Sequence, residues 1–251
     1  MLQRILERGQ RVSPLLQAPW VTTRIFRIDW LHCADQGVTA DWLGNLFGLI
    51  AAKLPGANVK ARTTALWSLI QEAYAAGGVE DRLQNLTPTM IKQSKKAPKL
   101  RCSAAEARAL VPIAHAMAQE LLSAADPLEC AARVGTHHLH ECYRALSHES
   151  IFSADILHEN SVKFALQYVA LEASADPGTK SWRIKPKLHL FLELCSDGSK
   201  PALFWNYRDE DYGGSVARLS RRRGGLLSVK AFSSNMLERF KIQQPVIRMM
   251  P

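Results

Sequence analysis

The chain has 251 residues, of which 47% are hydrophobic and 22% are charged, and this is the composition of a folded globular protein. No apolar run reaches the roughly 18 residues that a membrane-spanning helix needs, and the charged N-terminal sequence MLQRILERGQRV differs from a secretory signal. We therefore expect a nuclear or cytoplasmic protein without a membrane segment.

The net charge of +9 is concentrated in the C-terminal third. Residues 176–251 hold 14 Lys and Arg against 7 Asp and Glu, whereas residues 1–175 are nearly balanced. Such a basic region favours a polyanionic partner, of which nucleic acid is the usual one. A basic face that is only solvated is the alternative.

The cysteines are five in number, widely spaced, and contain no CxxC pair. An odd number without paired spacing indicates reduced thiols that serve mainly as small core residues. They are Cys33, Cys102, Cys130, Cys142 and Cys195.

The predicted elements begin with an N-terminal arm over residues 1–21, which two prolines make irregular. Alternating apolar and polar residues predict a strand over residues 22–28 that ends at Asp29. Apolar residues at helical spacing follow, and Asp41 is the expected cap of a helix that runs to about Lys53.

The rest of the chain has the periodicity and capping signals of helices. An exposed basic loop over residues 91–101 separates a short helix that begins at Thr87-Pro88 from the later ones. Residues 187–195 fit a helix or a buried strand, and the dominance of Leu and Glu favours the helix. Gly213-Gly214 is expected to interrupt the last helix, and residues 221–225 to end it. The other expected helices span about residues 62–76, 103–123, 126–146 and 153–173.

These patterns predict a mainly α fold with one or two short strands. We expect one mostly helical domain over residues 22–225 and a C-terminal tail over residues 226–251.

Asp29 and His32 form a DxxH string where the predicted strand meets a helix. A carboxylate on such a rigid edge is well placed to hold a divalent metal, and the histidine could support it. The competing interpretation is a helix-capping aspartate beside a partly buried histidine.

Glu210 follows an aromatic run and stands in the acidic string Arg208-Asp209-Glu210-Asp211. Metal-dependent phosphoryl transfer needs carboxylates from distant parts of the chain, so Glu210 and Asp29 are candidate ligands for Mg²⁺. The alternative is an acidic first helical turn that the helix dipole stabilises.

A third candidate site is the string THHLHEC. It would be a zinc site if four side chains converged, although no second half-site is evident. A polar helix face is the alternative. The residues are His137, His138, His140 and Cys142.

A basic strip in the C-terminal third is the candidate nucleic-acid site. Lysine and arginine would contact phosphates, and Trp182 would provide a stacking platform for a base. The basic residues are Lys180, Arg183, Lys185, Lys187, Arg218, Arg221, Arg222 and Arg223.

Three segments resemble pieces of transposon-derived open reading frames and, more distantly, the C-terminal part of CACTA (En/Spm)-type transposases. They are IDWLHCADQGVTADWLGN, LTPTMIKQSKKAPKLRCSAAEARALVPI and WRIKPKLHLFLELC…FWNYRDEDYGG. Those enzymes carry an RNase H-like fold with an Asp-Asp-Glu metal triad. Asp29 and His32 match a D-x-x-H string of the family, residues 185–189 match a KPKxH segment, and Glu210 matches the final acid.

The resemblance implies that this chain is the helical half of an RNase H-like domain. A complete enzyme would cleave and transfer DNA strands with Mg²⁺, with Asp29 and Glu210 as ligands and His32 in support. The strand that bears the first acid has no match here. We therefore expect a catalytically inactive remnant that binds DNA, with self-association as a further option. The rival hypothesis is a non-enzymatic helical scaffold.

Overall fold

The computed structural model describes residues 27–147, 151–176 and 178–221, the last seven of them by backbone alone. Within these ranges every regular element is a helix and no strand occurs, so the mainly α class is confirmed. The predicted arm, the predicted tail and most of the predicted strand lie outside the described residues. Arg27 and Ile28, the last two strand positions, are irregular.

The chain divides into two compact units, Met1–Trp205 and Asn206–Pro251, a division that falls inside the domain expected over residues 22–225. In the described part of the first unit the first element is a π-helix, η2 (Leu31–Thr39), which continues directly into α3 (Ala40–Lys53). The second unit contains α10 (Tyr207–Arg221). The remaining elements of the first unit are α4 (Val59–Ala76), α5 (Pro88–Ile91), α6 (Ala104–Leu121), α7 (Pro127–Ala145), α8 (Ala154–Ser174), α9 (Pro186–Ser196) and the 3-10 turn η3 (Pro201–Leu203).

Most helices begin where local capping chemistry predicts. Ser103 and Glu106 form the expected capping box, in which the Glu106 N–H donates to Ser103 Oγ at 3.2 Å and the Ser103 N–H donates to Glu106 Oε2 at 2.7 Å. Asp126 caps α7 in the same way, since its Oδ1 accepts the Glu129 N–H at 2.9 Å. The ambiguous stretch 187–195 is helical, as expected, and forms most of α9.

Two local predictions are wrong. Asp41 does not cap α3, because the preceding π-helix already runs into it and Thr39 is helical. Gly213 and Gly214 do not interrupt α10, which is continuous from Tyr207 to Arg221. Glycine lowers the stability of a helix without forbidding it.

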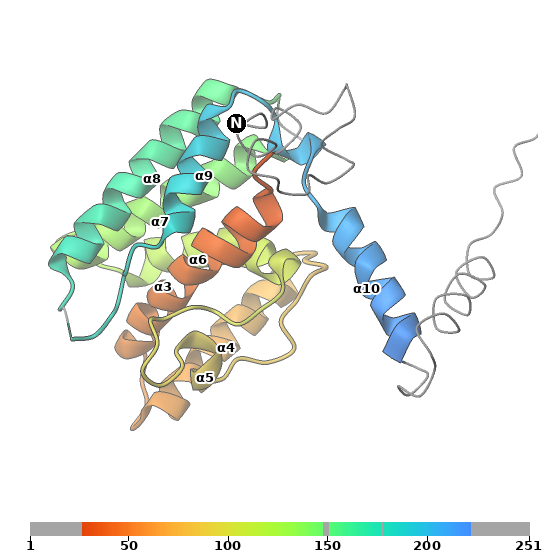
Figure 1. The fold of residues 1–251 in the computed structure, drawn as a ribbon. Helices are drawn as coiled ribbons and strands as arrows, with labels where there is room; N and C mark the ends of the chain where they lie inside the picture. The colour runs from red at the N-terminus through yellow and green to blue at the C-terminus, as the bar shows by residue number, and fades with distance from the viewer. Residues whose placement is uncertain (1–26, 148–150, 177, 222–251) are drawn as a thin grey trace, which may run out of the picture. The chain divides into compact units, whose positions relative to one another are not determined.

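The helices of the first unit pack in a chain of neighbours (Figure 1). Helix α8 packs against both α7 and α9, and α7 also packs against α6. Helix α3 contacts α4, α5, α6 and η2 and therefore lies at the centre of this unit. No helix in the described ranges is both long enough and apolar enough to cross a membrane.

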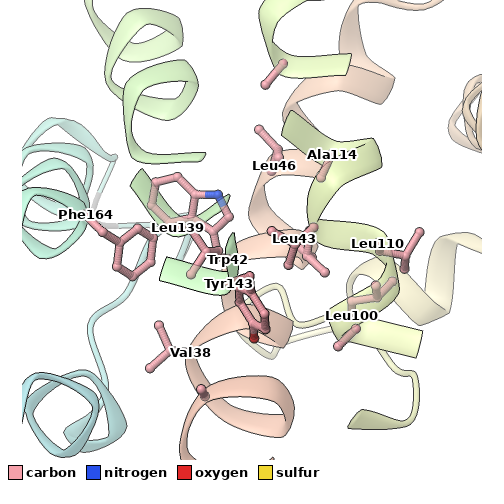
Figure 2. Packing of buried hydrophobic residues seen from close by; sticks show 14 of the residues in the cluster. Val38, Trp42, Leu43, Leu46, Leu100, Leu110, Ala114, Leu139, Tyr143 and Phe164 are labelled. Carbon is pink, nitrogen blue, oxygen red and sulfur yellow. The ribbon is translucent and has the colours of Figure 1, made fainter. Parts of the chain in front are cut away.

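The core is built around Trp42 of α3, which is fully buried (Figure 2). Its ring centroid lies 4.8 Å from that of Phe164, 5.2 Å from Tyr168 and 4.9 Å from Trp182. Edge-to-face aromatic contacts at these separations add to the stability that burial alone gives. Gly135 of α7 makes room for this ring, because a Cβ there would lie 2.4 Å from Trp42 Cη2. Trp42 thereby joins α3 to α7, α8 and the segment before α9.

Candidate functional site

Two basic segments that are far apart in the sequence wall one pocket of about 470 Å³. They are the predicted basic loop, residues 91–101, and the segment of residues 180–187 that leads into α9. The other lining residues are Ala97, Ile184 and Pro186, so no acidic side chain among the described residues lines it. We call it the basic pocket, and its cationic residues are Lys95, Lys96, Lys99, Lys180, Arg183 and Lys185.

The basic loop is closed at its base by backbone hydrogen bonds. The Lys99 N–H donates to the Ile91 carbonyl at 3.0 Å, and the Arg101 N–H donates to the Met90 carbonyl at 2.8 Å. These bonds satisfy backbone groups that a loop would otherwise expose. The loop therefore presents its lysines from a defined backbone.

Lysine side chains also tie the two segments to each other. Lys180 Nζ donates to the Lys95 carbonyl at 3.0 Å, and Lys92 Nζ donates to the Thr179 carbonyl at 3.3 Å. Lys180 therefore helps to hold the pocket together as well as adding charge to it.

Backbone strain is concentrated in the same two segments. Lys95, Lys180 and Trp182 have φ values of 62°, 56° and 55°, and they are the non-glycine residues with positive φ in the described part of the chain. Such a conformation is unfavourable for a bulky side chain and persists only where its surroundings enforce it. Strain of this kind gathers at functional sites, which marks the two segments as a candidate site.

Helix α3 forms the base that joins these segments, and Asp41 makes the first of its three connections. The Asp41 side chain is 6% exposed, and Lys185 Nζ donates to its Oδ1 at 2.6 Å. Burial lowers the pKa of the neighbouring Lys99, an effect that Asp41 opposes and that Lys187 and Lys185 reinforce. Asp41 thus compensates part of the positive charge gathered at this end of α3.

Gly44 makes the second connection, by allowing the basic loop to lie directly on α3. A Cβ on Gly44 would lie 2.5 Å from Lys99 N and 2.7 Å from Leu100 N, which is too close for any side chain. The Leu100 N–H donates to the Ala40 carbonyl at 2.8 Å beside it. Glycine is therefore required at position 44 by a close backbone approach.

Asn45 makes the third connection, to the segment before α9. Its Oδ1 accepts the Trp182 N–H at 2.7 Å, and its Nδ2 donates to the Asp41 carbonyl at 2.8 Å. Asn45 is buried, so both bonds satisfy polar atoms that water does not reach. Residues 41, 44 and 45 of the sequence DWLGN together fix the basic pocket.

The predicted basic strip is only partly assembled. Lys180, Arg183 and Lys185 line the basic pocket. Lys187 does not, and its Nζ donates to the His32 carbonyl at 2.6 Å. The stacking platform is a wrong prediction for Trp182, because its side chain is 4% exposed and packs on Trp42.

The arginines at the end of the predicted strip belong to the second unit or lie beyond the described residues. Arg218 and Arg221 are in α10, where the backbone alone is described. Arg222 and Arg223 lie outside the described residues. The predicted grouping of these arginines with residues 180–187 therefore stays a prediction, and the sequence reasoning did not foresee the contribution of the basic loop.

Asp29 and His32 form a local pair at the start of η2. Asp29 Oδ2 lies 2.6 Å from His32 Nδ1 and accepts the His32 N–H at 2.9 Å. The bond to the His32 N–H matches the capping aspartate of the alternative interpretation, but His32 is exposed and not partly buried. Glu210 lies in the first turn of α10, in the other unit.

The Mg²⁺ site that the transposase resemblance implies stays a prediction, because its proposed ligands Asp29 and Glu210 belong to different units. Among the described residues no group of three or more His, Cys, Asp or Glu side chains is placed to hold a metal ion. One carboxylate oxygen of Asp29 is already engaged by the ring and the N–H of His32. We therefore derive no catalytic step from these side chains.

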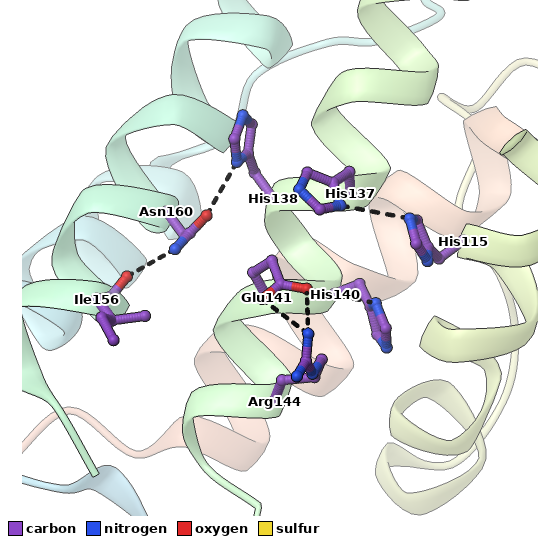
Figure 3. Close-up of polar contacts among 8 residues, drawn as sticks. All are labelled: His115, His137, His138, His140, Glu141, Arg144, Ile156 and Asn160. Atoms are coloured by element: carbon purple, nitrogen blue, oxygen red, sulfur yellow. Dashed lines mark hydrogen bonds and ion pairs between the residues drawn. The ribbon is translucent and has the colours of Figure 1, made fainter. Parts of the chain in front are cut away.

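The predicted zinc ligands on α7 do not converge, and Figure 3 shows His138 turned away from His137 and His140. His138 turns toward α8, where its Nδ1 lies 2.9 Å from Asn160 Oδ1. Cys142 is fully buried and faces the Leu157 carbonyl. The four residues therefore do not form the tetrahedral set that zinc requires.

The other two histidines meet His115 of α6, which sequence reasoning missed. The ring centroid of His115 lies 4.6 Å from that of His140 and 5.3 Å from that of His137. Burial, and after it the neighbouring His115, lowers the pKa of His140 to about 4. His115, His137 and His140 form a histidine cluster, and His140 is neutral near pH 7.

The cysteines are all free thiols, in agreement with the expected reduced state. Burial raises the pKa of Cys195 to about 12 and that of Cys102 to about 12. A thiol with such a pKa is protonated at neutral pH and is a poor nucleophile. These two cysteines are packing residues.

Comparison with known proteins gives no relative: no family model, no curated protein and no solved structure matches the chain. The resemblance to CACTA-type transposases therefore rests on the three sequence segments alone.

Proposed function

We propose that this chain binds DNA through the basic pocket. The observation that carries the proposal is the convergence of six cationic side chains from two separate segments on one pocket that no acidic residue lines. Lysine and arginine side chains bind phosphates and release the counterions condensed on DNA. The transposase resemblance supports DNA over other polyanions, and it is compatible with a nuclear or cytoplasmic location.

Side-chain pairing shows which cations are available for phosphate. The carboxylate of Asp41 compensates the charge of Lys185. The ammonium group of Lys99 donates one hydrogen bond to the Gln36 carbonyl, and that of Lys180 donates one to the Lys95 carbonyl. Lys96 and Arg183 are exposed, and no hydrogen bond or ion pair engages their side chains within the described part of the chain. They are the positions where DNA contacts can be removed with least effect on the fold.

The test compares two double variants with the same change in net charge. Lys96→Gln/Arg183→Gln removes two charges from the basic pocket. Lys60→Gln/Lys163→Gln removes two exposed charges from α4 and α8, and neither residue lines the pocket. The affinity of each for a labelled DNA duplex is measured by fluorescence anisotropy at about 50 mM salt, where phosphate contacts are strong.

The proposal predicts that the pocket variant loses at least about 10-fold in affinity, since one hydrogen bond to a charged group contributes roughly 1.5–3 kcal/mol. The control variant should lose about threefold or less, because it changes only the general attraction. Equal losses in both variants would refute a role of the pocket. Wild-type protein that does not bind DNA would favour the helical scaffold instead.

A further inference from the structure

A second cavity, of about 400 Å³, adjoins the two segments that wall the basic pocket. Neighbouring residues alternate between the two: Pro98 lines this cavity and Lys99 lines the basic pocket, while Ser181 lines this cavity and Lys180 lines the basic pocket. The same strained backbone therefore shapes both spaces, and we call the second one the α3 cavity.

The lining of the α3 cavity includes both apolar and hydrogen-bonding residues. Leu49, Ile91 and Leu128 are among the apolar ones. Asp176 and Lys92 are among the polar ones: one carboxylate oxygen of Asp176 accepts the Gly178 N–H at 2.9 Å, and the Lys92 ammonium group donates to the Thr179 carbonyl at 3.3 Å, which leaves each group with capacity for a further hydrogen bond. This combination suits a flat heterocycle that carries both donors and acceptors on its edge, and the volume lies within the usual range for small-ligand sites.

Glycines of α3 leave the space open. Gly44 and Gly48 stand one helical turn apart and both line the cavity. Glycine is required at position 44 because the basic loop lies directly on it. At position 48 a Cβ would have only Ile91 Cγ2 within 4 Å, at 3.9 Å, which is an ordinary van der Waals contact. Glycine at position 48 is therefore not needed for packing, and a larger side chain there would fill the cavity without displacing backbone.

We propose that the α3 cavity accepts one unpaired nucleobase of a DNA strand whose phosphates lie in the basic pocket. This inference rests on the proposed function, since the phosphate contacts bring the strand to the cavity. An unpaired base fits such a site because apolar side chains cover its faces while polar groups bond its edge. A base in a duplex offers neither its faces nor its pairing edge, so the cavity distinguishes a single strand from a duplex.

The test uses Gly48→Leu, which fills the cavity from α3, and Gly78→Leu as its control, since a Cβ on Gly78 meets nothing within 4 Å. Affinities are measured for a labelled single strand and for the duplex of the same length. Because base contacts of this kind contribute roughly 1–3 kcal/mol, Gly48→Leu should bind the single strand about 10-fold more weakly. The affinity of Gly48→Leu for the duplex should change less than about twofold, because a paired base does not enter the cavity. Gly78→Leu should change its affinity for the single strand and for the duplex by less than about twofold, because Gly78 does not line the cavity.

Thermal unfolding checks that the variants are folded. If Gly48→Leu does not fold, Ser174→Leu is used in place of Gly48→Leu, because it fills the same cavity from the exposed end of α8. Unchanged single-strand affinity, or an equal loss for single strand and duplex, would overturn the inference while DNA binding itself stands. Wild-type protein that binds neither DNA would refute the proposed function and the inference together.

Discussion

At the scale of single residues, the ion pair of Asp41 and Lys185 is the contact on which the basic pocket depends most. Asp41 is buried within α3, so its charge has little access to water. Lys185 supplies the compensating charge at 2.6 Å and remains 37% exposed at the rim of the pocket. A buried carboxylate that loses such a partner keeps the cost of its desolvation without the compensating attraction.

The variant Lys185→Met should therefore lower the free energy of unfolding by about 1–3 kcal/mol, as removal of one partner of a buried polar pair does. Asp41→Asn/Lys185→Met should recover part of that loss, because it removes the uncompensated charge as well. Urea denaturation of the two variants measures the difference. If the double variant were less stable than Lys185→Met, removal of the uncompensated charge would have recovered nothing, and the two side chains would not interact as described.

The histidine cluster gives a second prediction at this scale. Burial holds the pKa of His140 at about 4, below its ordinary value of 6.5, and the neighbouring histidines act in the same direction while Glu141 opposes them. Between these two values the unfolded chain binds a proton that the folded chain does not. The free energy of unfolding should therefore fall as the pH is lowered from about 6.5 toward about 4.

Urea midpoints at several pH values measure this loss. The variant His140→Phe removes the buried imidazole and should weaken the pH dependence. His189→Phe changes a histidine that is 76% exposed on α9 and should leave it unaltered. If His140→Phe retained the whole pH dependence of the wild type, the histidine cluster would not be its source.

At the scale of elements, α3 and the basic loop form one structural unit because Gly44 has no side chain. Gly48 stands on the same helix and provides an internal comparison, since its Cβ position is open. Both substitutions to alanine gain helix propensity, which amounts to about 1 kcal/mol. Only a Cβ at position 44 would clash with backbone atoms, which belong to Lys99 and Leu100.

Gly44→Ala should destabilise the chain by about 1–3 kcal/mol, as overpacking in a close contact does. Gly48→Ala should be neutral or more stable by up to about 1 kcal/mol. Chemical denaturation measures both, and hydrogen exchange at Leu100 reports whether the loop has moved from α3. Equal stability of the two variants would mean that the loop does not rest on Gly44 in solution.

The helices could largely be predicted from the sequence because their signals are local. Ser103 and Asp126 cap the helices that follow them, and no distant residue is needed to read either signal. The candidate site could not be predicted in this way. Residues 91–101 and 180–187 were both recognised as basic, but their meeting depends on contacts with α3 that carry no sequence signal.

Trp182 shows why exposure cannot be inferred from charged neighbours. Lys180 and Arg183 flank it in the sequence and are exposed, whereas its own ring turns into the core against Trp42 and Tyr168. The positive φ of Trp182 permits this reversal of direction over two residues. The role of Asp41 in the candidate site could not be predicted for a related reason, since its partner Lys185 is remote in the sequence.

At the scale of the whole molecule, positive charge is concentrated by the fold of the first unit. The chain carries a net charge of +9, and in the first unit its cations are brought together where two segments converge on α3. The folded helices hold that arrangement, and they enforce the strained backbone of Lys95, Lys180 and Trp182 within it. If this site contacts DNA phosphates as proposed, its affinity for DNA should depend strongly on salt.

The measurement that tests this account most directly is the salt dependence of DNA affinity, for the wild type and for Lys96→Gln/Arg183→Gln. Each phosphate contact contributes about −0.9 to the slope of log affinity against log salt concentration. The account predicts a wild-type slope of about −3 or steeper, and a slope that is shallower by about 2 in the variant, since two contacts are lost. A wild-type slope near zero, or the same slope in both proteins, would contradict it.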